Sequence, residues 1–223
     1  MYLANNTRSD IIFSVNVLAR YSSEPTRRHC NRIKHIFRYL CGTHDMGLFY
    51  QKNIESKLVG YADARYLSYP HKVRSQSGYV FTYGGTTISW RSTKQTLTAT
   101  SSNHAELIAL YEAGRECVWL RSMIQHIQEE CALESIQKNP TILYEDNAAC
   151  IAQIKEGYIK GDRTKHISPK FFSTHDLQKD GLINVTQIKS SDNLVDLFTK
   201  SLPRKTFEQL LQKIGLCRLK DVH

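Results

Sequence analysis

The sequence has no long hydrophobic run. No stretch of its 223 residues approaches the roughly 20 consecutive apolar residues that a membrane-spanning helix requires. The opening segment, MYLANNTRSD, is too polar to form the apolar core of a signal peptide. We therefore expect an intracellular chain that is not secreted and has no membrane partner.

Paired cysteine motifs are also absent. The six cysteines show no CxxC spacing, and none pairs with a histidine at zinc-finger intervals. We expect these thiols to be reduced, and we expect no structural zinc site. With 41% hydrophobic and 23% charged residues, the composition suits a globular chain with a packed core and excludes low-complexity and collagen-like classes.

Basic residues outnumber acidic ones, 30 to 21, which gives a formal net charge of +9. This excess favours a polyanionic partner, because Lys and Arg that neutralise phosphates release counterions. The first fifty residues carry nearly half of the net charge and have the pattern of two amphipathic helices separated by a turn at 22–25. In the second helix, Arg28 and Arg32 are candidates for phosphate contact. The alternative is a basic face that contacts only solvent.

From residue 47 the pattern changes to short extended segments, with a hairpin signal at Gly84-Gly85. The periodicity predicts strands over 47–51, 57–66, 77–83, 86–92, 141–146 and 182–189, and helices over 103–130, up to 154, and over 168–179, 193–202 and 203–214. This order predicts an α/β domain over 50–202. We expect a mixed sheet whose first three strands are antiparallel, with the N-terminal helices as an appendage.

Two acidic residues occupy unusual positions. Asp63 lies inside the predicted strand VGYADARY, where aspartate is depleted because it competes with the ladder and buries a charge. Glu106 continues the apolar stripe of the long helix back to its first turn, so it should face the sheet. The alternatives are a solvent-facing acid on an edge strand for Asp63 and a capping box, Asn103-x-x-Glu106, for Glu106.

Two further acids follow strands. Asp146 ends the strand TILYED, at the edge where open α/β sheets bind ligands; the alternative is a helix cap formed by Asp146 or Asn147. Asp196 lies in a helix after the last strand, and its alternative role is a surface ion pair with Lys200.

These four carboxylates come from elements that should converge. Clustered acids repel one another unless a cation lies among them, and oxygen ligands suit Mg²⁺ or Mn²⁺. Two such ions can activate a water and stabilise the leaving oxygen of a phosphodiester. The sequence therefore predicts a metal-dependent nuclease.

Five motifs carry a family resemblance: YADARY with Asp63, SSNHAELIAL with Glu106, YEDNAACI with Asp146, RTKHI at 163–167 and NLVDLFTKSL with Asp196. In order and spacing they resemble the ribonuclease H domain of copia-type retrotransposon Pol polyproteins. The resemblance covers 51–202. Residues 1–50 resemble the end of the reverse transcriptase and its connection, and 203–223 would form a C-terminal helix and tail.

The resemblance implies a ribonuclease H-like fold, with a mixed five-stranded sheet flanked by helices. It also implies hydrolysis of the RNA strand of RNA/DNA hybrids during reverse transcription, giving a 5′-phosphate and a 3′-hydroxyl. The four acids would bind two Mg²⁺ ions, or Mn²⁺. The implied partners are the hybrid and the reverse transcriptase portion of the polyprotein. The implied location is the cytoplasm, in a virus-like particle, or the nucleus.

The chain departs from the family pattern in two places. Arg65-Tyr66 stands where copia-type domains usually have Asp-Trp. Cellular ribonucleases H carry a histidine in the loop before the last acid, but the corresponding loop here, 190–195, has none. His166 fits the copia-type pattern and is a candidate for catalysis or product release, or else for a helix cap. The other candidates for nucleic-acid contact are Asn147, Arg163 and Lys165.

Two rival functions remain open at this point. One is a catalytically silent nucleic-acid-binding remnant of a truncated polyprotein. The other is a transposase or integrase, which the absence of an HHCC zinc module disfavours. Polymerase activity is not expected, because the segment YEDN has asparagine where the Y-x-D-D signature requires a second aspartate.

Overall fold

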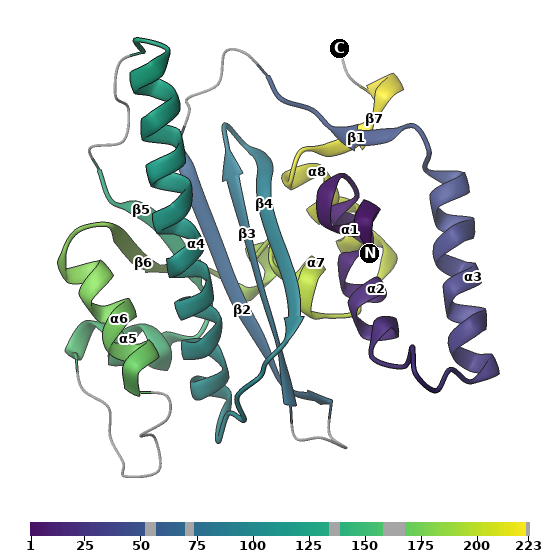
Figure 1. Cartoon of the computed structure of the whole chain (residues 1–223), viewed down its shortest axis with the longest axis horizontal. Helices are drawn as coiled ribbons and strands as arrows, with labels where there is room; N and C mark the ends of the chain where they lie inside the picture. The colour runs from purple at the N-terminus through teal and green to yellow at the C-terminus, as the bar shows by residue number, and fades with distance from the viewer. Residues whose placement is uncertain (52–56, 70–73, 134–138, 158–167, 222–223) are drawn as a thin grey trace.

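A five-stranded mixed sheet forms the centre of the protein, as the computed structural model in Figure 1 shows. The structure describes residues 1–51, 57–69, 74–133, 139–157 and 168–221. The strand order is β4-β3-β2-β5-β6, and the strands are β2 (Leu58–Tyr69), β3 (Arg74–Tyr83), β4 (Thr86–Lys94), β5 (Thr141–Glu145) and β6 (Ile183–Gln187). The first three are antiparallel, whereas β5 runs parallel to β2 and β6 parallel to β5. The predicted mixed sheet is confirmed.

One face of the sheet is covered by the long helix α4 (Ser102–Glu130), with α5 (Ala148–Glu156) and α6 (Ser168–Lys179) beside it (Figure 1). The predicted stripe of α4 is buried from Leu110 through Cys117 to Leu120. Packed against β2 and β3, it forms the larger hydrophobic core. This burial orients the first turn of α4 toward the sheet, as the periodicity predicted.

The helical N-terminal region lies on the opposite face (Figure 1). Its helices are α1 (Tyr2–Asn6), α2 (Ile12–Ala19) and α3 (Arg27–Gly42), and they share a second core with the C-terminal helices α7 (Asp196–Thr199) and α8 (Arg204–Lys213). Trp90 on β4 donates a hydrogen bond to the carbonyl of Ala4, at 2.8 Å. The appendage is therefore packed directly on the sheet.

A buried polar cluster holds α3 in place. Arg8 pairs with Asp10 at 2.7 Å, and the hydroxyl of Tyr39 on α3 donates to the same carboxylate at 2.6 Å. Arg8 also donates to the carbonyl of Thr43 at 2.9 Å. Because each charged group has several partners, its desolvation is offset by hydrogen bonds.

The segment predicted as a strand at 47–51 forms β1 (Met46–Leu48), outside the central sheet. It pairs antiparallel with β7 (Leu216–Arg218), which no pattern in the sequence predicted. Both strands are only three residues long, too short for a period-two pattern to be recognised.

Among the described residues, none of the helices has the length and apolarity that crossing a bilayer demands.

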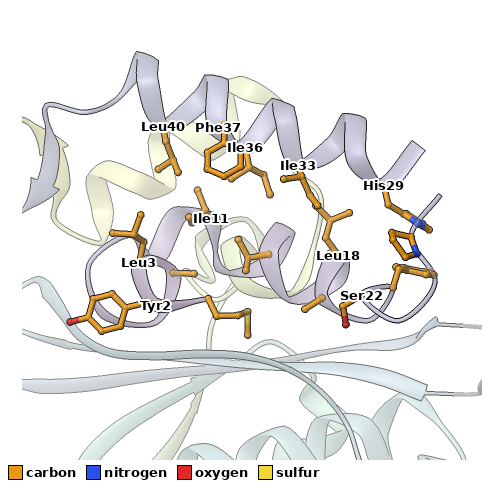
Figure 2. Close-up of a pocket in the computed structure, with 16 residues that line it drawn as sticks. Tyr2, Leu3, Ile11, Leu18, Ser22, His29, Ile33, Ile36, Phe37 and Leu40 are labelled. Atoms are coloured by element: carbon orange, nitrogen blue, oxygen red, sulfur yellow. The ribbon is translucent and has the colours of Figure 1, made fainter. Parts of the chain in front are cut away.

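An apolar groove of about 470 Å³ lies between α3 and the first two helices (Figure 2). Leu3, Ile11 and Leu18 line one side, and Ile33 and Phe37 of α3 line the other. Ile33 and Phe37 are 41% and 62% exposed, and no residue of α3 is fully buried, although Ile36 and Leu40 pack against the second core.

Candidate active site

Asp63 lies on β2, the middle strand of the sheet, and is only 2% exposed. The solvent-facing edge strand considered as an alternative is therefore wrong. The cross-strand partner of Asp63 on β3 is Gly78. A Cβ atom at Gly78 would lie 2.7 Å from the methyl group of Thr199 on α7. The missing side chain at Gly78 lets α7 pack onto the sheet, and the Thr199 hydroxyl donates to Asp63 at 2.5 Å.

Glu106 lies in the first turn of α4 and is 6% exposed. The capping box is wrong, because Ser101 is the N-cap and accepts from the backbone N–H of His104. The Glu106 carboxylate instead accepts a hydrogen bond from the backbone N–H of Ala64, at 2.6 Å. This bond anchors Glu106 beside Asp63.

Asp146 comes directly after β5. Tyr61 on β2 is paired in parallel register with Tyr144 on β5, so Asp63 and Asp146, each two residues further on, come at the same level. The cap of α5 is Asn147, whose side chain accepts from Cys150 N–H at 3.1 Å. The side chain of Asp146 is thus left available to the site. It accepts a 2.6 Å hydrogen bond from the hydroxyl of Ser190.

Three of the predicted acids converge. Each of these three residues places one carboxylate oxygen within 4.8 Å of the other two: Asp63, Glu106 and Asp146. Asp196, on α7, is outside this group but close to it. Lys200 connects the two, because its ammonium lies 2.6 Å from Asp196 Oδ1 and 3.2 Å from Asp63 Oδ1. The predicted Asp196–Lys200 ion pair exists, but it forms part of the acidic cluster.

A fifth carboxylate, Glu145, was missed by the sequence analysis. It is fully buried on β5; its Oε1 accepts from Asn147 N–H at 3.1 Å, while its Oε2 has no hydrogen-bond partner among the described residues. The structure buries Thr141, Leu143 and Glu145, every second residue of β5. Glu145 follows the apolar Leu143 by two residues, and this spacing could have indicated that it shares the inward face of the strand.

Burial dominates the electrostatics of the cluster. It raises the pKa of Glu106 to about 11, with further contributions from Glu145 and Asp63. Burial also raises the pKa of Asp63 and Asp196, while Lys200 opposes both shifts. Crowded carboxyl groups of this kind resist ionisation unless positive charge is added.

The donor set fits a hard divalent cation. All the converging groups are carboxylate oxygens, and Mg²⁺ and Mn²⁺ prefer such ligands. Glu145, whose buried Oε2 has no hydrogen-bond partner among the described residues, is a further carboxyl group close to Glu106 and Asp63, and burial raises its pKa well above the ordinary value. Hydroxyls of Ser190 and Thr199 fix the orientation of two carboxylates, as outer partners of metal ligands commonly do.

The candidates for nucleic-acid contact have different positions. Arg28 and Arg32 are exposed on α3 and line a groove of about 540 Å³ that also reaches Ser201, the residue after Lys200. Asn147 has a structural role as a helix cap. The RTKHI candidates, Arg163, Lys165 and His166, lie outside the described residues.

The chain aligns with transposon polyproteins over nearly its whole length. It is 32% identical over 216 residues to "Retrovirus-related Pol polyprotein from transposon TNT 1-94" of Nicotiana tabacum. The chain belongs to the family of copia-type retrotransposon Pol polyproteins. The alignment covers 97% of the chain but only 16% of the tobacco protein. The chain thus spans about a sixth of the length of that relative.

The chain is also similar to a shorter protein described as "Secreted RxLR effector protein 161" of Plasmopara viticola. It is 42% identical over 120 residues, which are 54% of this chain and 84% of that protein.

No family model matches the chain. Among solved structures, the N-terminal ribonuclease H domain of a Mycobacterium tuberculosis protein aligns with 71% of the chain and 98% of that chain, at 14% identity and a TM-score of 0.46. That alignment is too distant to support a function.

Proposed function

We propose that this member of the Pol family is a ribonuclease H that cleaves the RNA strand of RNA/DNA hybrids during reverse transcription. The observation that supports this most directly is the convergence of Asp63, Glu106 and Asp146 within 4.8 Å, from two strands and a helix. We assign 51–202 to the ribonuclease H domain, 1–50 to the end of the reverse transcriptase and its connection, and 203–223 to the C-terminal helix and tail.

In this proposal Asp63, Glu106, Asp146 and Asp196 would hold Mg²⁺, or Mn²⁺. When bound, two such ions supply the positive charge that activates a water and stabilises the leaving oxygen, giving a 5′-phosphate and a 3′-hydroxyl. The backbone N–H of Ala64 holds the Glu106 carboxylate in place. Burial of Asp63 and Glu106 excludes bulk water from one side of the cluster and strengthens its electrostatics.

Recognition of the hybrid would depend on 2′-hydroxyls and on its shape, so we expect weak sequence preference. The groove lined by Arg28 and Arg32 is also lined by Ser201, which follows Lys200 of the acidic cluster in the chain. α3 carries five Lys and Arg and no acid, which suits a phosphate backbone.

Charge reversal on α3 is expected to weaken hybrid binding. The double variant Arg28→Glu with Arg32→Glu would lose two phosphate contacts. A plot of the logarithm of the dissociation constant against the logarithm of the salt concentration should then have a slope smaller by about two. Fluorescence anisotropy with a labelled hybrid at several salt concentrations measures this. The reversal Arg204→Glu, at an exposed arginine on α8, is the matched control. Equal affinity of the double variant and wild type at low salt would support the solvent-facing alternative.

We further propose that the apolar groove of Figure 2 packs against the reverse transcriptase portion of the same polyprotein. The chain spans 16% of the tobacco relative, so most of such a polyprotein lies outside it. Ile33 and Phe37 would be covered by that portion. Co-purification of the chain with the reverse transcriptase segment should be lost in Phe37→Asp but not in Ile127→Asp, at another exposed apolar residue. Equal capture by both variants, or self-association of the chain instead, contradicts this.

Activity is tested by incubating the purified chain with an RNA/DNA hybrid labelled on each strand, in Mg²⁺ or in EDTA. We expect RNA cleavage only in the hybrid and only with Mg²⁺, with single-stranded and duplex RNA left intact. Hybrid binding without cleavage would favour the silent remnant. Cleavage of the DNA strand would contradict the ribonuclease H assignment.

A further inference from the structure

Lys200 places a positive charge inside the acidic cluster. Its ammonium lies 2.6 Å from Asp196 Oδ1 and 3.2 Å from Asp63 Oδ1, so it bridges the central strand and α7. The helix α7 ends at Thr199, which donates to the other oxygen of Asp63. Both oxygens of Asp63 therefore have partners from two consecutive residues.

This contact differs from an ordinary surface pair. The Asp63 side chain is 2% exposed and that of Asp196 is 14% exposed, so neither carboxylate is well solvated. Ion pairs of buried groups are screened little by salt, and removal of one partner leaves an uncompensated charge. The Lys200 side chain itself is 29% exposed, which leaves its flexible stem a route toward solvent.

We propose that Lys200 is a positioning residue that holds Asp63 and Asp196 together in the metal-free protein and withdraws from Asp63 when a divalent ion binds. This inference rests on the proposed metal-binding function of the cluster. The Asp63 carboxylate would otherwise be shared between the ammonium and the ion. Two cations at one carboxylate repel each other, so the ammonium and the ion would compete for it.

The competition has a directional consequence. If Lys200 must leave Asp63 for the ion to bind, part of the binding free energy is spent on breaking that contact, and the apparent affinity falls. Removing the ammonium should then tighten metal binding while it weakens the metal-free protein. A purely structural ion pair would affect stability but would not tighten binding.

The test is calorimetric titration of MgCl₂ into the whole chain, together with thermal unfolding in EDTA. We expect Lys200→Met and Lys200→Gln to bind Mg²⁺ on the order of tenfold more tightly than wild type, because the competing charge is gone. Both variants should have a lower Tm in EDTA and a larger rise in Tm upon addition of Mg²⁺. Lys200→Arg, which retains the charge, should bind Mg²⁺ no more tightly than wild type.

Lys213→Met is the matched control, because Lys213 also pairs with a carboxylate, Asp192, at 2.9 Å, and both side chains of that pair are about half exposed. It should leave Mg²⁺ affinity unchanged. Equal or weaker Mg²⁺ binding by both neutral Lys200 variants would overturn the role of Lys200 and leave the proposed function intact. Failure of wild type and all variants to bind Mg²⁺ would overturn both the role of Lys200 and the proposed metal site.

Discussion

Asp146→Asn is expected to lower hybrid cleavage at least about a hundredfold, because the carboxylate charge that would hold the metal is worth several kcal/mol in the transition state. Asparagine retains the shape of the side chain and can still accept the hydrogen bond of Ser190. Folding and hybrid binding should therefore persist. Asp146 is only partly buried, so loss of its charge leaves no unpaired buried group.

The comparison is made as single-turnover cleavage of a labelled hybrid, with anisotropy as the binding measurement. Asp192→Asn provides the matched control, since Asp192 is an exposed acid on the neighbouring turn and pairs with Lys213. The control should cleave at the wild-type rate. Wild-type turnover by Asp146→Asn would contradict the assignment of Asp146 as a metal ligand.

Glu106→Gln is expected to have opposite effects on activity and on metal-free stability. Cleavage should again fall at least about a hundredfold, because a carboxylate of the cluster is lost. Glutamine can still accept from Ala64 N–H, so the anchor remains. In EDTA at pH 7 the variant should be more stable than wild type by about 1–3 kcal/mol, because it avoids the crowding of buried carboxyl groups.

The sign of this stability difference follows from proton linkage. Burial raises the pKa of Glu106 in the folded chain to about 11, above its ordinary value in the unfolded chain. The folded state therefore binds the extra proton, and wild type loses stability as the pH rises between these two values. Glutamine does not titrate. The advantage of Glu106→Gln in EDTA should shrink as the pH is lowered toward the unfolded value near 4.3.

Urea unfolding in EDTA between pH 5 and pH 9 measures this trend. Glu116→Gln is the control, since Glu116 on the same helix accepts from Ser89 and lies outside the cluster. A stability difference that does not depend on pH, or one that grows as the pH falls, would contradict the electrostatic account of Glu106. An unaltered cleavage rate would contradict its role in the site.

Most of the sheet could be predicted from the sequence because its elements are long and strongly periodic. The apolar stripe of α4 and the hairpin at Gly84-Gly85 are each determined by residues close together in the sequence, so local sequence patterns predict them. The pairing of β1 with β7 joins two three-residue segments about 170 positions apart. No local pattern encodes such a pair, and only tertiary packing brings them together.

Two acids of the site were visible because their positions in the pattern are unusual. Asp63 interrupts a strand, and Glu106 occupies a position of the apolar stripe in the first turn of a helix. Glu145 was overlooked because the next residue, Asp146, already accounted for the acid expected at the end of this strand. The bridge from Lys200 to Asp63 could not be predicted. It depends on the close approach of α7 to the sheet at Gly78, a distance that sequence spacing does not specify.

The most direct test of the central claim is the chemistry of the RNA ends produced from a hybrid in Mg²⁺. The account predicts RNA fragments with 5′-phosphate and 3′-hydroxyl termini, ligatable without further treatment, no product in EDTA, and an intact DNA strand. Fragments with 2′,3′-cyclic phosphates, or the same products in EDTA, would contradict metal-dependent hydrolysis by the carboxylate cluster.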